Sequence, residues 1–223
     1  MNTIELKSAY EAAYHKSATA IYFAPGRVNL IGEHTDYNGG FVFPCALSFG
    51  TYLLIAPNNE QKINLRSLNV EAVYSLELSQ LTTPLPDKAW ANYPIGVFAQ
   101  FIKRGVAIEQ GYDMLFWGNV PAGAGLSSSA AMEVVTAYAF NELLGTGYDR
   151  TELAKIGQKA EHEFAGVMCG IMDQFASAQG RQDHAIYLNC DTLEFDLVPV
   201  KLEGIKVVVS NTHSPHHLDS GAY

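Results

Sequence analysis

Side chains able to bind phosphate and sugar hydroxyls crowd into the short segment 24–40, which glycines divide and end. Within it, Arg27 offers a planar fork of N–H donors that matches phosphate oxygens. Glu33, His34 and Asp36 add the acceptors and the donor that sugar hydroxyls require. The same three residues could bind a metal ion, but their spacing matches no standard metal motif. A solvated loop is the third interpretation, and composition alone favours it.

A glycine- and serine-rich stretch, 118–129, follows an expected strand and opens an expected helix. Glycines let a backbone approach a ligand closely, and a helix start presents unpaired N–H groups and a positive dipole end. These features are typical of a phosphate-binding loop. The stretch is no Walker A loop, because Ala124 stands in place of lysine, and it lacks the third glycine of a dinucleotide fingerprint. A plain strand–helix connection with serine caps is the alternative.

Two carboxylates stand out in a third segment, 161–175. Asp173 lies among apolar side chains just after a glycine, and Glu161 lies beside the apolar stripe of an expected helix, from which it could project inward. Buried carboxylates need a partner, a metal ion or a task. Taken singly, a helix-capping aspartate and a surface glutamate are the alternatives.

The elements that must position these segments are read from hydrophobic periodicity and turn residues. Helices are expected over 5–16, 90–103 and 151–164, and another directly after the serines at 127–129. Strands are expected over 20–23, 41–43, 51–56, 63–65, 72–78, 112–117, 186–188, 193–197 and 205–209. Strands come first, then helices, then strands again, which indicates an α+β fold and not a strict βαβ repeat.

Composition excludes several classes of function. The 223 residues are 48% hydrophobic and 17% charged, which fits a globular protein with a sizeable core. The net charge of -9 repels phosphate backbones, so nucleic acid and anionic membranes are not expected partners, although local N–H groups can still hold one nucleotide. No membrane span or secretory signal is visible, and the three cysteines form no metal or disulfide pattern. A cytoplasmic location is therefore expected.

The three segments resemble those of galactokinases, which belong to the wider family of galactokinase, homoserine, mevalonate and phosphomevalonate kinases. The run 26–38 is similar to the galactokinase signature, 121–130 to the phosphate-binding motif, and 169–174 to the segment with the catalytic aspartate. The likeness extends from about residue 20 to Tyr223. Thirteen specified positions in the first run leave little room for chance.

The resemblance implies a two-layer α+β fold of mixed and antiparallel sheets with helices, the ribosomal S5 domain 2-like kinase domain. Residues 1–180 would form this amino-terminal kinase domain, and 181–223 would supply strands that lead into an incomplete carboxy-terminal domain. Family members continue past the equivalent of Tyr223 to a third glycine-rich motif, so we expect the carboxy-terminal domain to be largely missing and strand 205–209 to lack neighbours. The full-length enzyme would be a monomer.

The resemblance also implies residue roles. Asp173 would act as the base near the sugar C1 hydroxyl, while Arg27 would keep Asp173 ionised and stabilise the transferring phosphoryl group. Ser129 and Glu161 match the family's Mg²⁺ ligands, and an oxygen-only set suits that ion. The expected galactose-binding residues are Glu33, His34, Thr35, Asp36, Gly170, Asp173 and Tyr223. The expected ATP-binding residues are Ser67, Trp90, Gly123, Ala124, Gly125, Leu126, Ser127, Ser128 and Ser129.

The predicted function is therefore ATP-dependent phosphorylation of the C1 hydroxyl of α-D-galactose to galactose 1-phosphate. A loose transition state needs little activation of the nucleophile, so we expect Asp173 to act mainly by steering the hydroxyl. Two alternatives stay open. One is a catalytically silent sensor that binds galactose and ATP, and the other is a truncated remnant without activity.

Overall fold

A five-stranded mixed sheet forms the centre of the computed structural model, which describes residues 1–87, 89–120 and 125–210. The strand order is β1-β3-β6-β4-β5, with β4 and β6 parallel and the other neighbours antiparallel. The strands are β1 (Ala20–Asn29), β3 (Pro44–Asn58), β4 (Lys62–Ser67), β5 (Tyr74–Glu77) and β6 (Gly111–Gly118).

A second sheet of three antiparallel strands lies beyond one end of the first. Its order is β2-β7-β8, from β2 (Phe41–Val42), β7 (His184–Asn189) and β8 (Phe195–Pro199). Because β2 lies in the connection between β1 and β3, this sheet joins an early segment of the chain to a late one. The expected domain boundary at residue 180 stays a prediction.

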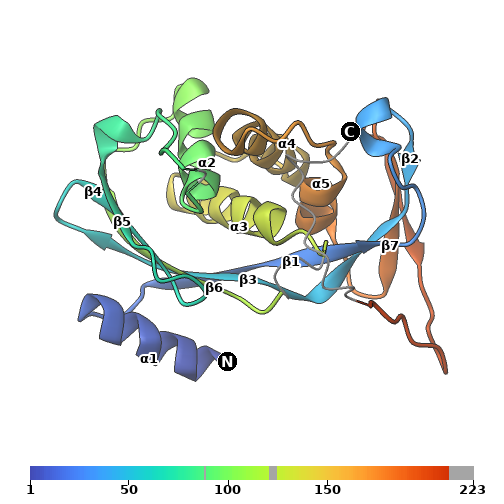
Figure 1. The fold of residues 1–223 in the computed structure, drawn as a ribbon, viewed down its shortest axis with the longest axis horizontal. Helices are drawn as coiled ribbons and strands as arrows, with labels where there is room; N and C mark the ends of the chain where they lie inside the picture. The colour runs from blue at the N-terminus through green and yellow to red at the C-terminus, as the bar shows by residue number, and fades with distance from the viewer. Residues whose placement is uncertain (88, 121–124, 211–223) are drawn as a thin grey trace.

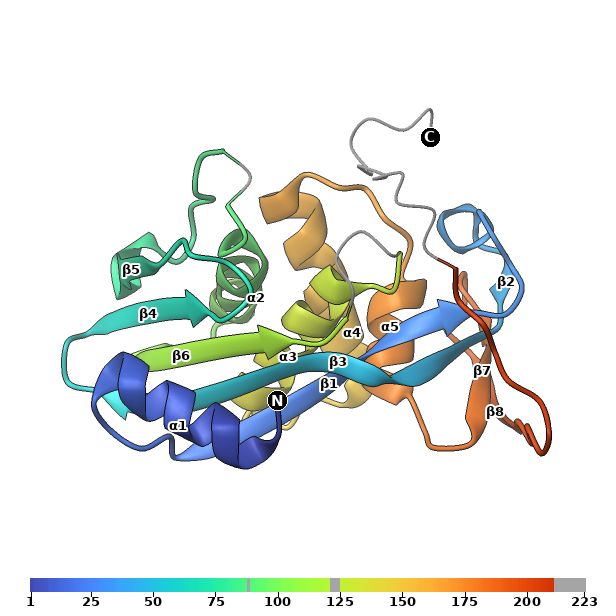
Figure 2. The same ribbon diagram turned by 60° about the horizontal axis from the view of Figure 1, so that its bottom comes forward.

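Helices cover the larger sheet on both faces. Figure 1 shows α2, α3, α4 and α5 above the sheet and α1 below it, and Figure 2 shows α1 lying across the strands. The predicted α+β class is confirmed. The helices are α1 (Thr3–Tyr14), α2 (Asn92–Lys103), α3 (Ser128–Leu143), α4 (Arg150–Ala160) and α5 (Met172–Gln179), with short turns η1 (Asp36–Asn38), η2 (Leu78–Gln80) and the π-helical η3 (Glu161–Ala165).

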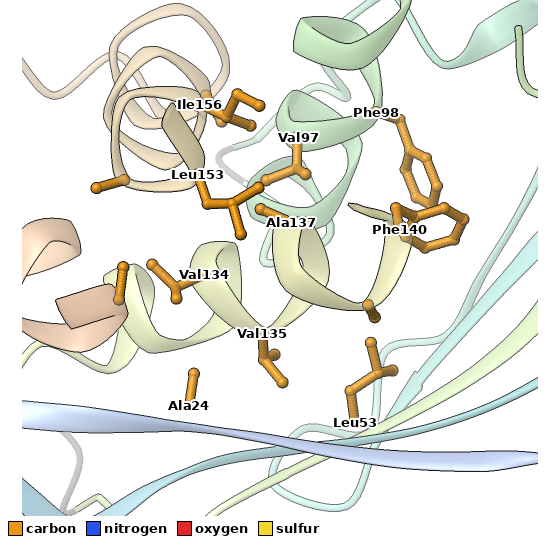
Figure 3. Close-up of a cluster of buried hydrophobic side chains, with 14 of the residues drawn as sticks. Ala24, Leu53, Val97, Phe98, Val134, Val135, Ala137, Phe140, Leu153 and Ile156 are labelled. Carbon is orange, nitrogen blue, oxygen red and sulfur yellow. The ribbon is translucent and has the colours of Figure 1, made fainter. Parts of the chain in front are cut away.

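Alternation along β3 divides the core between the two faces. Leu53 and Ile55 point to the side of α2–α5, whereas Leu54 and Ala56 point to α1, as the period of two in a strand requires. Figure 3 shows the larger cluster, in which side chains of α2, α3 and α4 meet those of β1 and β3. Each such leucine or isoleucine contributes about 1.5–3 kcal/mol on burial. This packing holds the beginnings of α3 and α5 in fixed places above the sheet.

Helix α1 is fastened to the opposite face by a buried polar group. Asp113 of β6, with its side chain 9% exposed, accepts from Lys16 (2.6 Å), Asn58 (2.9 Å) and Asn64 (2.7 Å). Tyr10 of α1 donates to the carbonyl of the same aspartate (3.0 Å). Polar contacts thus fix the register of a helix whose buried apolar surface is small.

Replacing Asp113 with alanine is expected to lower the free energy of unfolding by roughly 2 kcal/mol at neutral pH, because three donors lose their acceptor. Burial alone would raise the pKa of Asp113, but the bonds from Lys16, Asn64 and Asn58 outweigh it and lower the pKa. The ionised carboxylate therefore stabilises the fold above its unfolded pKa, and this stabilisation is lost as the pH falls through the lower folded pKa. The deficit of the variant should shrink below about pH 4.

Urea unfolding followed by circular dichroism at several pH values measures this deficit. The matched control is Glu152→Ala, which removes a carboxylate from a largely exposed pair with Lys155 (2.7 Å) and should cost less than about 0.5 kcal/mol. Equal losses in the two variants, or a deficit of Asp113→Ala that grows in acid, would contradict the assignment.

Two expected elements are wrong in detail, and one helix was missed. The expected helix 151–164 ends as an α-helix at Ala160 and continues as η3. Helix α5 was not expected at all. The expected strand 205–209 is not formed: Ile205 donates to Leu202 in a turn, and Val208 is 80% exposed. A strand needs a neighbour for its backbone groups, and no strand of the described residues pairs with this segment. No helix within the described ranges is long and apolar enough to cross a bilayer.

Candidate active site

A salt bridge between β1 and α5 lies at the centre of the site. Nε and Nη2 of Arg27 approach Oδ1 of Asp173 at 2.8 and 2.6 Å. The two residues are 146 positions apart in the chain, so only the folded sheet and helix layer brings them together. The carboxylate is in the second position of α5, where the helix dipole also favours negative charge.

The phosphate loop candidate lies directly against β1. The strand register shifts between Pro25 and Arg27, a bulge that bends the strand at this point. A Cβ on Gly26 would come 2.5 Å from the carbonyl oxygen of Leu126, so only glycine permits this approach. The N–H of Arg27 donates to that carbonyl (3.3 Å), and Nη1 of Arg27 donates to the carbonyl of Gly125 (2.6 Å).

Ser127 connects the same loop to the catalytic aspartate candidate. Its hydroxyl donates to Oδ2 of Asp173 (2.6 Å), opposite the oxygen that Arg27 contacts. Ser127 adopts a left-handed conformation with φ of 61°, which is uncommon for a residue other than glycine and is typical of functional sites. Helix α3 begins at the next residue, Ser128. The carboxylate is therefore held from both sides, by a cation and by a hydroxyl.

Glu161 forms the second part of the site, in the first position of η3. It is 3% exposed, and it accepts from Gln174 (2.6 Å) and from the thiol of Cys169 (3.5 Å). Burial raises the pKa of Glu161, as does the negative charge of Asp173, and hydrogen bonds from Ser129, Cys169 and Gln174 offset part of this rise. Ser129 and Glu161, expected as joint metal ligands, are thus neighbours.

The sugar-binding candidates Asp36 and Gly170 meet near Asp173. A Cβ on Gly170 would overlap the carboxylate of Asp36, so glycine is required for the two segments to pack. Burial raises the pKa of Asp36. The N–H of Tyr37 lowers it again in part, while the charge of Asp173 adds to the rise. Two carboxylates therefore share this corner of the site with Arg27.

The other polar residues of the 24–40 segment are bonded within their own loop. Glu33 accepts from Asn29 (3.1 Å), and Nδ1 of His34 lies 2.6 Å from the hydroxyl of Tyr37. The hydroxyl of Thr35 lies 2.7 Å from each of two loop carbonyls. These bonds shape the loop beside Asp36, and the role of these three residues in sugar binding stays a prediction.

Ser67 and Trp90 are grouped around the strand that leads into the phosphate loop. Ser67 pairs with Phe116 of β6 in the sheet, and the Trp90 ring packs edge-on against the Phe116 ring at 5.8 Å. The indole N–H donates to the carbonyl of Ala72 (3.0 Å). Since β6 ends at Gly118, both residues lie beside the strand that precedes the loop, and their role in nucleotide binding stays a prediction.

Three expected site residues, Gly123, Ala124 and Tyr223, lie outside the described residues. The structure also contains two site neighbours that the sequence patterns did not single out, Glu133 and Gln174, both fully buried. A glutamate inside the apolar pattern of 128–143 was the available signal for the first. The glutamine directly after Asp173 had no distinguishing pattern.

Comparisons of the sequence with known proteins match two family models and many curated relatives. The GHMP kinases N terminal domain matches residues 92–181, and the galactokinase galactose-binding signature matches residues 8–57. A galactokinase of Fusobacterium nucleatum is 48% identical over 91% of this chain and 52% of its own length. A galactokinase of Bacillus subtilis is 43% identical over 98% of this chain and 57% of its own length. The chain therefore spans about half the length of the curated relatives it matches.

Solved structures give the same assignment. The Lactococcus lactis galactokinase complexed with galactose has a TM-score of 0.84 and 36% identity, covering 89% of this chain and 52% of that protein. The Methanococcus jannaschii mevalonate kinase shares the fold, with a TM-score of 0.70 and 20% identity. The match covers 83% of this chain and 57% of that protein.

The fold, with the glycine–serine loop against β1, is that of the amino-terminal domain of the galactokinase, homoserine, mevalonate and phosphomevalonate kinase class. Within that class, the chain matches the amino-terminal portion of galactokinases, and residues 8–57 carry the galactokinase galactose-binding signature.

Proposed function

We propose that this chain supplies the galactose- and ATP-binding residues of an enzyme that phosphorylates the C1 hydroxyl of α-D-galactose to galactose 1-phosphate. The observation that carries the proposal is the Arg27–Asp173 pair, held against the glycine–serine loop by Ser127 and Gly125. The loop is suited to phosphate, and the pair joins this loop to the neighbourhood of Asp36, which we propose binds the sugar. The galactokinase names of the relatives support the choice of sugar.

The proposed reaction follows from the donors and acceptors at this point. The C1 oxygen of galactose would attack the γ-phosphorus of ATP, the bond to the bridging oxygen would break, and ADP would leave. Asp173 would take the hydroxyl proton, because its carboxylate has more acceptor positions than Arg27 and Ser127 occupy. Arg27 would place its positive charge beside the transferring group, where negative charge is spread over three oxygens.

The residues around Glu161 fit the Mg²⁺ ion that such a reaction uses. The carboxylate is buried, receives hydrogen bonds from Gln174 and Cys169, and forms no ion pair within the described part of the chain. Ser129 supplies the neighbouring oxygen. When bound, Mg²⁺ would neutralise charge on the ATP phosphates. Ser129 and Glu161 would hold it at the start of α3, beside the phosphate loop.

A direct test combines binding with turnover. We expect isothermal titration to detect galactose binding, and radiolabelled ATP to yield galactose 1-phosphate only when galactose is present. Binding of both ligands without transfer in a full-length protein that contains this chain would favour the silent sensor over the enzyme. Absence of binding in a chain that circular dichroism reports as folded would overturn the proposal and favour the remnant.

Replacing Gly170 with alanine is expected to weaken galactose binding by about tenfold or more. The new methyl group would overlap Asp36 and displace a carboxylate proposed to bind the sugar, and a misplacement of about 1 Å can cost 100-fold in rate. Isothermal titration with galactose alone measures the effect.

The control is a double-mutant cycle with Asp36→Ala. If the methyl group acts by displacing Asp36, then Gly170→Ala should cost little more once Asp36 is truncated. Fully additive losses would show that Gly170 acts by another route.

A further inference from the structure

A buried polar bridge lies directly behind the proposed metal-binding residues. Nε2 of Gln174 donates to Oε2 of Glu133 (2.9 Å) and to Oε2 of Glu161 (2.6 Å). Glu133 and Gln174 are 0% exposed, and Glu161 is 3% exposed. One amide group from α5 thus joins a carboxylate of α3 to a carboxylate of η3.

This bridge is costly to the fold. Neither glutamate forms an ion pair within the described residues, and in the same part of the chain Oε1 of Glu133 and Oε1 of Gln174 have no hydrogen-bond partner. Burial and the charge of Glu161 raise the pKa of Glu133 well above its usual value. The same two carboxylates contribute, after burial, to raising the pKa of Tyr93 on α2 to about 12. Apolar side chains of similar size would pack here at lower cost, so the polar groups need a task.

The surrounding backbone makes room for the bridge. A Cβ on Gly157 of α4 would lie 3.1 Å from Cγ of Gln174 and 3.3 Å from Cβ of Glu133. These distances are tighter than ordinary contacts, so glycine lets α4 pack closely over the bridge. The close packing of α3, α4 and α5 leaves the Gln174 side chain little freedom to leave its two acceptors.

The same elements carry the bridge and the proposed catalytic groups. Glu133 lies one helical turn after Ser129 on α3, and Gln174 directly follows Asp173 on α5. An amide presents its two N–H groups in one plane, so the two bonds of Gln174 set the direction of the Glu161 carboxylate. Oε2 of Glu161 is thereby held from α5, and the hydroxyl of Ser129 donates to the same carboxylate.

We propose that Glu133 and Gln174 are positioning residues, which orient Glu161 toward Ser129 so that the two can hold the Mg²⁺ of a bound nucleotide. Neither residue touches the substrates. The inference rests on the proposed function and adds to it two residues that determine metal affinity.

The test titrates Mg²⁺ against the full chain mixed with a non-hydrolysable ATP analogue, and follows the rise in thermal unfolding temperature. Gln174→Met keeps the volume and removes both hydrogen bonds, so the Mg²⁺ midpoint should rise by about tenfold or more. Gln174→Asn is a milder change whose shortened amide cannot reach both carboxylates, and its midpoint should also rise. Glu133→Met should match Gln174→Met, while Glu133→Gln retains an acceptor and should restore most of the affinity.

Gln100→Met is the matched control. Gln100 is also buried and also donates to a glutamate, Glu163 (2.6 Å), but that pair lies between α2 and η3, away from Ser129. Its substitution should change the unfolding temperature without moving the Mg²⁺ midpoint.

The outcomes separate the two proposals. If variants of Glu133 and Gln174 have a lower unfolding temperature but the same Mg²⁺ midpoint as the unsubstituted chain, the positioning role is overturned. The proposed function would stay intact in that case. An unsubstituted chain that shows no Mg²⁺-dependent stabilisation by the analogue would overturn both.

Discussion

Replacing Asp173 with asparagine is expected to slow the proposed phosphorylation of galactose by roughly 100-fold or more in the full-length protein, the range over which positioned acid–base groups act. The variant keeps the shape of the side chain and an oxygen that can accept from Arg27, so the fold and the loop contact should persist. The variant loses the negative charge and the second acceptor oxygen. In the unsubstituted protein this oxygen, Oδ2, accepts from Ser127, and it would receive the sugar proton. Galactose-dependent ADP formation measures the loss, and the affinity for ATP should change little.

Asp196→Asn is the control for this variant. Asp196 is an exposed aspartate of β8, so its substitution makes the same change in net charge far from the salt bridge. If Asp173→Asn kept most of its turnover, positioning and charge neutralisation would suffice without this carboxylate, and its role as a base would be wrong.

The large elements could be predicted because their patterns are local. The alternation in β3 and the apolar stripe of α2 follow from the residues themselves, and helix 92–103 differs from the expected 90–103 only at its start. The α+β class followed from the order of these elements. A cytoplasmic location and a monomeric full-length enzyme stay predictions from the sequence.

Helix α5 could not be predicted because its cause is tertiary. Its eight residues mix small, polar and apolar side chains, and a helix of two turns is marginal by itself. In the structure it is stabilised by the buried ring of Phe175 and by the hydroxyl of Ser177, which donates to the carbonyl of Pro25 on β1 (2.7 Å). The helix that carries Asp173 therefore exists because β1 is already beside it.

The site was predicted by resemblance, and the residues alone did not suffice. Each carboxylate had a simpler interpretation when taken singly, and the pairing of Arg27 with Asp173 depends on a separation of 146 residues. Glu133 is an example of a site neighbour that neither the sequence patterns nor the resemblance singled out. A glutamate in a helix is usually exposed, and this one is buried because its side of α3 packs against neighbouring helices.

Arg27→Ala is expected to lower turnover by roughly 1,000-fold while nucleotide affinity falls by less than about tenfold. The loop keeps its backbone bond between residue 27 and Leu126 in this variant, so the ground-state phosphate site should persist. The missing guanidinium acts where charge develops during transfer, because it is fixed between Asp173 and the carbonyl of Gly125. Arg27→Lys is the matched control. It retains the positive charge without the planar fork of donors, so its turnover should lie between that of the unsubstituted protein and that of Arg27→Ala. Titration with a non-hydrolysable ATP analogue separates binding from turnover, and parallel losses in both would place Arg27 in ground-state phosphate binding.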